Sequence, residues 1–120
     1  MRPLLLLLED EALIAMDVAD VLEEAGYSVV TIASARDALD WLDAHVPDIA
    51  VVDVYLPDGD CEPVATALQS RGIPFLVHSG SIAKEFADTP FAGAPWVSKP
   101  VRMEELLAAI TSARVNSRLG

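Results

Sequence analysis

The chain has few cysteines and few positive charges, and both shortages narrow the functions open to it. Its one cysteine, Cys61, can form no internal disulfide and no cysteine-based metal cluster. Lys and Arg number 8 against 19 Asp and Glu, which gives a formal net charge of -11. Phosphates would be repelled by such a surface, which argues against direct binding to nucleic acid or an anionic membrane. We therefore expect a cytoplasmic protein that binds neither.

Long hydrophobic runs are also missing. The leucine run Leu4–Leu8 is too short for the apolar core of a signal peptide, and it stops at Glu9 and Asp10. No other segment approaches the length of a membrane span. A hydrophobic content of 52% over 120 residues is nevertheless enough for the core of one domain. We expect a soluble single domain over residues 1–120, with no effector domain following it.

Short apolar segments alternate with segments of helical periodicity. The predicted strands are Leu4–Leu8, Ser28–Ile32, Ile49–Val52, 74–78 and Trp96–Ser98. The predicted helices are 12–25, one capped by Ser34, one beginning at Pro63, and 103–114, after which we expect fraying. This alternation predicts an α/β fold with a doubly wound parallel sheet, flavodoxin-like strand order 2-1-3-4-5 and helices on both faces. Prolines and glycines in 81–95 predict a fourth helix that is short or loop-like.

The third predicted strand ends in a carboxylate. Ile49–Val52 is an unbroken apolar run, typical of a strand covered on both faces, and Asp53 follows it before a turn rich in Pro, Asp and Gly. Ligands of open parallel sheets bind beyond the carboxyl ends of the strands. Asp53 is therefore a candidate nucleophile or metal ligand. Taken alone, it is equally consistent with an aspartate that caps the next turn.

The other strand ends carry polar residues as well. In the order 2-1-3-4-5, Glu9 and Asp10 at the end of the first strand lie next to Asp53. Ser79 follows the fourth strand and Lys99 the fifth, so both are expected at the same edge. Singly, Ser79 could cap a turn and Lys99 could be a solvated charge. Together these residues predict a site.

In this order the residues resemble the receiver domain of two-component response regulators, over the whole chain. The likeness rests on Glu9-Asp10, on Asp53 followed by Leu56-Pro57, on Ser79-Gly80 and on Lys99-Pro100. The resemblance implies that Asp53 accepts a phosphoryl group from a histidine kinase or histidine phosphotransfer protein. It further implies that Glu9, Asp10, Asp53 and the Tyr55 backbone carbonyl hold Mg²⁺, and that Ser79 and Lys99 assist. A phosphoacceptor of this kind is not an enzyme, although it assists its own phosphorylation and dephosphorylation.

Physical chemistry supports these roles. Three neighbouring carboxylates raise one another's pKa unless a cation lies among them, and Mg²⁺ prefers hard oxygen ligands. A transferred phosphoryl group is a loose, charged species, so positioning and charge neutralisation dominate its chemistry. We expect Lys99 and Mg²⁺ to balance its charge, and the Ser79 hydroxyl to donate a hydrogen bond to it.

Some residues depart from the family pattern. Glu9 stands where Asp is commoner, and His78 precedes Ser79 where a small or apolar residue is usual. His78 is interpreted as hydrogen-bonded structure without a catalytic role. Trp96 occupies the place of the family's Tyr or Phe switch, three residues before Lys99. The segment from Pro74 is similar to a receiver variant with a PFxxATGY-like signature, which replaces helix four by a loop. With Trp96 and Ser79 as the switch, ordering of residues 81–94 is the expected output.

An exposed patch on the first helix is the candidate kinase-docking surface. Met16 lies almost opposite the predicted buried stripe, which includes Ile14, Val18, Val21, Leu22 and Ala25, and Leu13 lies well off that stripe. In related receivers this helix meets the phosphodonor domain. Exposed apolar side chains beside the predicted site suggest the same use here.

Three other classes of protein are alternatives to the receiver domain. A flavodoxin-type cofactor binder needs small residues after the first strand to bind a phosphate, and this chain has Glu9, Asp10 and Glu11 there. A haloacid-dehalogenase-like phosphatase needs a second Asp where Tyr55 stands. The remaining alternative is a pseudo-receiver that acts as an unphosphorylated docking module, which the intact Asp53, Ser79 and Lys99 weigh against.

Overall fold

The computed structural model describes residues 2–53, 55–56, 59–60, 62–79, 94–99 and 102–119. Strands and helices alternate up to residue 53. The elements are β1 (Leu4–Leu8), α1 (Ala12–Glu24), β2 (Ser28–Ile32), α2 (Ala35–Leu42), β3 (Ile49–Val52), β4 (Tyr55–Leu56), β5 (Gly59–Asp60), α3 (Glu62–Ser70), β6 (Phe75–Ser79), β7 (Trp96–Ser98) and α4 (Met103–Leu119).

Five strands form one parallel sheet in the order β2-β1-β3-β6-β7, which confirms the predicted topology. The two short strands β4 and β5 form a separate antiparallel pair, in which Tyr55 is paired with Asp60 and Leu56 with Gly59. The sequence indicated only a turn in this segment. Its Pro-Asp-Gly residues favour a turn. The pairs Tyr55–Asp60 and Leu56–Gly59 are nevertheless enough to form two short strands.

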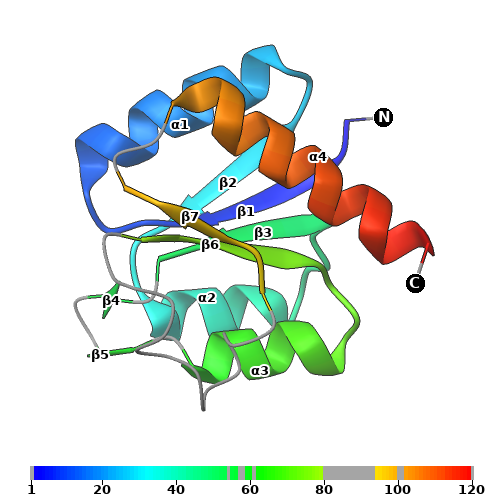
Figure 1. Ribbon diagram of the computed structural model, residues 1–120. Helices are drawn as coiled ribbons and strands as arrows, with labels where there is room; N and C mark the ends of the chain where they lie inside the picture. Colours follow the sequence, from blue (N-terminus) through cyan, green and yellow to red (C-terminus); the bar gives the residue numbers. More distant parts are fainter. Residues whose placement is uncertain are drawn as a thin grey trace.

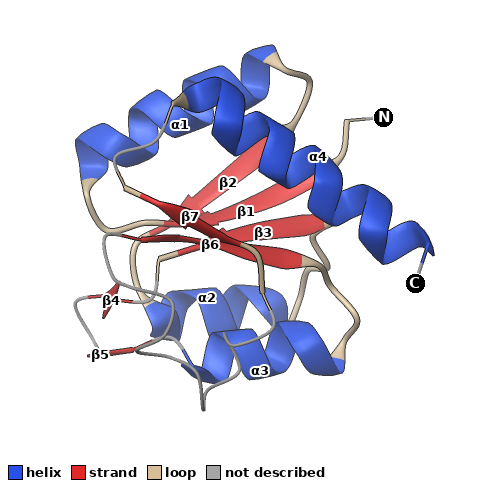
Figure 2. Cartoon of the chain, viewed as in Figure 1, coloured by secondary structure: helices blue, strands red, loops and turns tan. Residues whose placement is uncertain are grey.

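The molecule has three layers (Figures 1 and 2). Helices α1 and α4 cover one face of the sheet, and α2 and α3 cover the other. Each strand contributes alternate side chains to two separate cores, because successive residues of a strand face opposite sides of the sheet. On β1, Leu6 and Leu8 pack toward α2 and α3, whereas Leu5 and Leu7 pack toward α1 and α4.

The first helix buries a stripe spaced by three and four residues, namely Ala15, Val18 and Leu22. The predicted stripe was wrong at Ala25, which is exposed. Because α1 ends at Glu24, Ala25 is already its C-cap and has left the inward face. Gly26 then turns the chain with a φ of 106°, a left-handed conformation that favours glycine.

The predicted cap of α2 is confirmed, since the Ser34 side chain accepts a hydrogen bond from the Asp37 backbone N–H at 3.2 Å. Several boundaries differ from the prediction, including β6, which is Phe75–Ser79 where 74–78 was predicted. Pro63 is the second residue of α3, because Glu62 already has helical structure and places an acidic side chain in the first turn. The last helix continues past residue 114 to Leu119, where fraying was expected. The prediction of a short or loop-like helix in 81–93 lies outside the described residues.

Among the described residues, no helix has both the length and the apolar character needed to cross a membrane.

Candidate functional site

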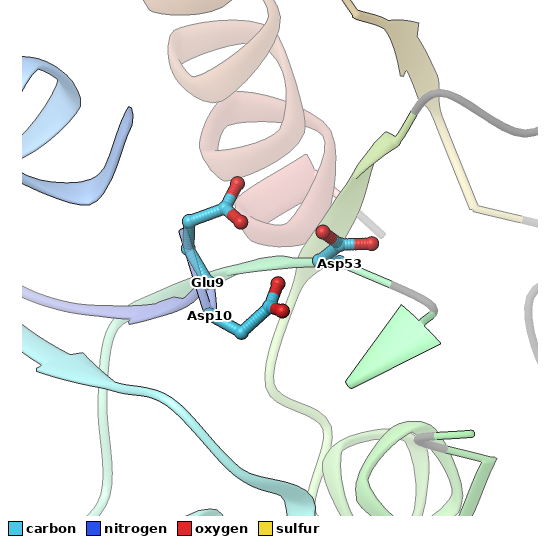
Figure 3. Close-up of side chains that lie close together, drawn as sticks. All are labelled: Glu9, Asp10 and Asp53. Carbon is cyan, nitrogen blue, oxygen red and sulfur yellow. The ribbon is translucent and has the colours of Figure 1, made fainter. Parts of the chain in front are cut away.

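Three carboxylates gather at the carboxyl edge of the sheet. One oxygen from each of Glu9, Asp10 and Asp53 lies within 4.8 Å of the others. Figure 3 shows Glu9 and Asp10 extending from the end of β1 and Asp53 from the end of β3, with the three side chains close together. Glu9 and Asp53 are buried, and Asp10 is exposed. The predicted acidic cluster therefore forms, with one member open to solvent.

Backbone hydrogen bonds fix this arrangement. The Glu9 N–H donates to the Ile32 carbonyl and the Asp53 N–H donates to the Leu8 carbonyl, both at 3.0 Å. The parallel ladder thus continues one residue past β1 and β3, and Glu9 comes to lie beside Asp53. Since side chains alternate along a strand, both acids share the sheet face of Leu7 and lie on the side covered by α1 and α4.

Lys99, which follows β7, joins two of the acids. Its ammonium donates to Glu9 Oε1 at 2.5 Å and to Asp53 Oδ2 at 2.9 Å, and its side chain is 16% exposed. The lysine and the two carboxylates are 90 and 46 positions apart in the sequence. Because this ion-paired group is partly buried, water screens the attraction between its charges less than in a surface salt bridge.

The shifted pKa values of Glu9 and Lys99 indicate that a further cation would stabilise the site. Burial raises the pKa of Glu9, and the hydrogen bond from Lys99 offsets this shift only in part. Burial acts to lower the pKa of Lys99, but the hydrogen bonds to Glu9 and Asp53 outweigh it and leave that pKa raised. Lys99 therefore stays charged, and Glu9 remains costly to ionise beside it. A divalent cation among the three acids would relieve that cost.

The donor set fits Mg²⁺, which takes oxygen ligands at about 2.0–2.1 Å, keeps several waters and uses one or two carboxylates directly. Oxygens lying within 4.8 Å of one another can face a single ion, directly or through its waters. Asp10, the exposed member, leaves the solvent side open for such waters. The ion would be held by the side chains of Glu9, Asp10 and Asp53.

His78 on β6 is a feature whose surroundings the sequence did not indicate. It is 5% exposed, and its Nε2 atom is buried with no hydrogen-bond partner among the described residues. Burial, together with the nearby Lys99 charge, lowers the pKa of His78 to about 4, so the ring is neutral at neutral pH. The interpretation of His78 as hydrogen-bonded structure was therefore wrong for this nitrogen. Period-two alternation from Leu76 could have placed it on the same face as Asp53.

The remaining predicted site residues lie where the topology requires. Ser79 ends β6 and is paired with Ser98, and Tyr55 begins β4 two residues past Asp53. The roles of the Ser79 hydroxyl and the Tyr55 carbonyl stay predictions. Trp96 is half-buried and packs against the core under α2 and α3.

The two residues of the predicted docking patch are both exposed. Leu13 is 78% exposed and Met16 is 62% exposed on α1. Met16 also lines a hollow of about 350 Å³ between α1 and the end of β2. Glu9 and Asp10 line the same hollow, so it opens directly beside the acidic cluster.

Comparison with known proteins gives a consistent result. Residues 5–111 match the family model of the response regulator receiver domain. The chain is 34% identical over 112 residues to the transcriptional regulatory protein PdtaR of Mycobacterium tuberculosis, covering 90% of this chain and 55% of that protein. It is 33% identical over 119 residues to the transcriptional regulatory protein PhoP of Escherichia coli K12, covering 95% and 53%. The chain thus spans about half the length of these curated relatives.

Solved structures show the same fold. A response regulator receiver protein from Sinorhizobium medicae aligns with a TM-score of 0.88 at 24% identity, covering 97% of each chain. A sensor protein from Polaromonas sp. JS666 aligns with a TM-score of 0.84 at 29% identity, covering 98% of this chain and 99% of that one. A CheY-like receiver domain from Methanospirillum hungatei aligns with a TM-score of 0.86 at 24% identity, covering 98% of each chain.

Proposed function

The chain belongs to the response regulator receiver domain family of two-component systems, and from that premise we propose that Asp53 is its phosphoacceptor. The observation that carries this proposal is the ion-paired group of Lys99 with Asp53 and Glu9, which lies within the acidic cluster. An aspartate held between a fixed cation and two further acids is suited to form a charged acyl phosphate. An aspartate that only caps a turn needs none of these neighbours.

In the proposed reaction, a carboxylate oxygen of Asp53 attacks the phosphorus of a phosphorylated histidine. The new O–P bond forms as the P–N bond breaks, and the bonding electrons return to the imidazole nitrogen of the donor. Lys99 already donates to Asp53 Oδ2 and is placed to neutralise the negative charge of the phosphoryl group. The Ser79 hydroxyl is the proposed further donor.

Receiver domains generally bind Mg²⁺ in an acidic pocket, and the cluster of Glu9, Asp10 and Asp53 supports the same proposal here. Bound Mg²⁺ would supply positive charge that offsets the charge of the carboxylates and of the phosphoryl group. The Tyr55 carbonyl is the proposed backbone ligand. Asp10 is the ligand whose loss should affect metal affinity alone, since Glu9 and Asp53 also bind Lys99.

Intact-mass measurement after incubation with acetyl phosphate and Mg²⁺ tests the proposal. We expect one added phosphoryl group, which hydroxylamine removes, as it does acyl phosphates. Asp53→Asn should gain nothing, and Asp48→Asn is the matched control. Asp48 directly precedes β3 and so lies at the other end of that strand, where its Oδ2 accepts the Leu4 N–H at 2.7 Å.

An equal mass gain in Asp53→Asn, or none in the wild type, would favour the alternative of an unphosphorylated docking module. The ion-paired group would then be structural. Replacing Lys99 by Met would in that case change stability but leave partner binding intact.

Receiver domains of response regulators generally take their phosphoryl group from histidine kinases, and we propose a histidine kinase or histidine phosphotransfer protein as the donor. The patch formed by Leu13 and Met16 is the proposed docking surface, because both are exposed and Met16 lines the hollow beside the acids. The names of the curated relatives describe transcriptional regulators. To this chain we assign the phosphoacceptor role, in the cytoplasm, without turnover of a small substrate.

The proposed output involves Trp96. Its indole is half-buried against the α2 and α3 core, so a rotation inward would require space that a packed interior lacks. We propose that phosphorylation changes the surroundings of Trp96. The expected ordering of residues 81–94 stays a prediction, because of that range only Ala94 lies within the described residues. Fluorescence of a Trp41→Phe variant with Mg²⁺ and beryllofluoride, together with amide exchange across 81–94, tests this. Unchanged emission and exchange would exclude it.

A further inference from the structure

His78 lies in a row of ionisable side chains that crosses the sheet. The pairing of β3 with β6 runs through Val52 and Val77, so one further residue on each strand places His78 beside Asp53. On its other side His78 is paired with Val97 of β7. By alternation from Leu76, its ring faces α1 and α4, the same side as Asp53 and Glu9.

Lys99 must cross this row to reach its partners. It follows β7, two strands away from β3, and neighbouring strands are about 4.8 Å apart, so the Lys99 and Asp53 side chains together span a lateral separation of roughly 10 Å. The strand between is β6, and the β6 residue on that face beside Asp53 is His78. The imidazole ring therefore lies under the path of the Lys99 side chain.

The imidazole also holds an unused hydrogen-bonding atom. Nε2 of His78 is buried without a partner among the described residues, and leaving such an atom unsatisfied destabilises the folded state. Leucine or valine in its place would avoid this cost, as Val77 and Leu76 do beside it. Lys99, meanwhile, has three N–H donors, and its two carboxylate bonds use two of them.

We propose that His78 is a positioning residue for Lys99. Its ring supports the lysine side chain across β6, and its Nε2 is the acceptor to which the ammonium turns when Glu9 is drawn toward a divalent cation. Lys99 then keeps its bond to Asp53 and exchanges Glu9 for His78. This inference rests on the proposed function, because it assigns Lys99 to the phosphoryl site and Glu9 to the cation.

Nitrogen NMR of the histidines tests the contact directly. The chain has two histidines, so ¹⁵N-histidine labelling gives only the signals of His78 and His45. His45 is an internal reference, since it is exposed and its Nδ1 contacts the Trp41 carbonyl at 3.0 Å, beyond the end of α2. We expect Mg²⁺ alone, and more strongly Mg²⁺ with beryllofluoride, to shift the Nε2 signal of His78 in the direction of an accepted hydrogen bond. Lys99→Met should abolish this shift, and the His45 signals should not move.

Two substitutions distinguish the packing of the imidazole ring against Lys99 from the hydrogen bond that its Nε2 accepts. His78→Gln keeps an acceptor near the position of Nε2, whereas His78→Leu keeps the volume and loses the acceptor. A hydrogen bond to a charged group is worth at least about tenfold in an equilibrium or rate, so His78→Leu should be phosphorylated by acetyl phosphate about tenfold more slowly. His78→Gln should stay within about twofold of the wild type, because it restores that bond. His45→Leu is the matched control and should match the wild type.

The possible outcomes are distinct. An Nε2 signal that does not respond to Mg²⁺, or that responds equally in Lys99→Met, overturns the proposal. Equal rates for His78→Gln and His78→Leu also overturn it, since only the volume would then matter. If wild-type Asp53 gains no phosphoryl group, the proposed function fails, yet the shift with Mg²⁺ alone still decides the role of His78. Both variants replace one buried residue by another of similar size, and circular dichroism should show both folded.

Discussion

The two faces of the sheet end differently at the same edge. On the face covered by α2 and α3, three side chains near this edge are apolar and at most 1% exposed: Leu8, Val52 and Val77. One residue further along the same strands, the side chains face α1 and α4. These side chains are ionisable: Glu9, Asp53 and His78. On each of the three strands, a buried apolar residue is therefore followed directly by an ionisable residue that faces the other side of the sheet.

This difference shows how the fold positions a charged site without flexible support. The apolar residues lock the strand ends against α2 and α3, so the acids that follow have fixed backbones. Those acids are then held by backbone hydrogen bonds and by Lys99. At this edge of the sheet, stability should depend mainly on the apolar side chains, and chemistry and pH sensitivity on the charged ones.

The largest effect is expected on the apolar face. Leu8→Ala removes a side chain that is 1% exposed and leaves a cavity, which should lower the free energy of unfolding by about 2–5 kcal/mol. Urea unfolding measures this loss. Leu13→Ala is the matched control, because Leu13 is 78% exposed and its truncation should cost less than about 0.5 kcal/mol. Equal losses in the two variants would contradict the division between the faces.

Lowering the pH should reduce the stability of the folded protein through the side chains of the charged face. The folded-state pKa of His78, about 4, lies below its ordinary value of 6.5, so the unfolded chain binds a proton first. The stability that the neutral ring contributes is complete above pH 6.5 and is lost as the pH falls toward 4. The full loss is on the order of 3 kcal/mol. Urea unfolding across this pH window measures it.

His78→Leu should lose less stability in this window than the wild type, by that amount. Glu9, whose pKa is raised by burial, titrates in the opposite sense, so the difference between the two proteins isolates the histidine. His45→Leu serves as the control for removing a histidine. If wild type and His78→Leu lose stability in parallel, the ring is not held neutral by the fold.

A smaller effect should follow from binding Mg²⁺. At a concentration ten times its dissociation constant, the ion should stabilise the folded protein by about 1.4 kcal/mol. Asp10→Asn should abolish most of this gain, since Asp10 belongs to the acidic cluster and has no bond to Lys99 among the described contacts. Asp17→Asn, an exposed acid on α1, is the matched control. Thermal unfolding with and without Mg²⁺ decides it, and equal gains in both variants would place the ion elsewhere.

Much of the arrangement of the two faces at this edge could be predicted from the sequence. The runs Leu4–Leu8 and Ile49–Val52 are apolar at every position, which indicates strands buried on both faces, and the structure confirms both. Acids that follow such runs had to lie at the carboxyl edge. The strand order then brought Glu9, Asp10 and Asp53 together, as predicted.

The rest depended on information that no local pattern contains. The bond from Lys99 to Glu9 requires the direction of a long, flexible side chain across three strands. The unpartnered Nε2 of His78 depends on the packing of both neighbouring strands. Boundaries were predicted least well: α4 continues to Leu119, although its predicted end was residue 114.

The smallest expected effect concerns the surface of the charged side, where a partner would approach. Met16→Glu should slow phosphoryl transfer from a histidine kinase by about fivefold, or ~1 kcal/mol, the size of an ordinary interface contact. Leu13→Glu should act in the same direction but less strongly, because Leu13 does not line the hollow beside the acids. Val46→Glu is the matched control, since Val46 is 72% exposed and precedes β3 at the opposite edge of the sheet. Transfer from acetyl phosphate should be unchanged in all three, because a small donor needs no docking surface. Slowing with both donors would instead mean that Met16 supports the acidic cluster itself, and the docking surface would have to lie on another helix.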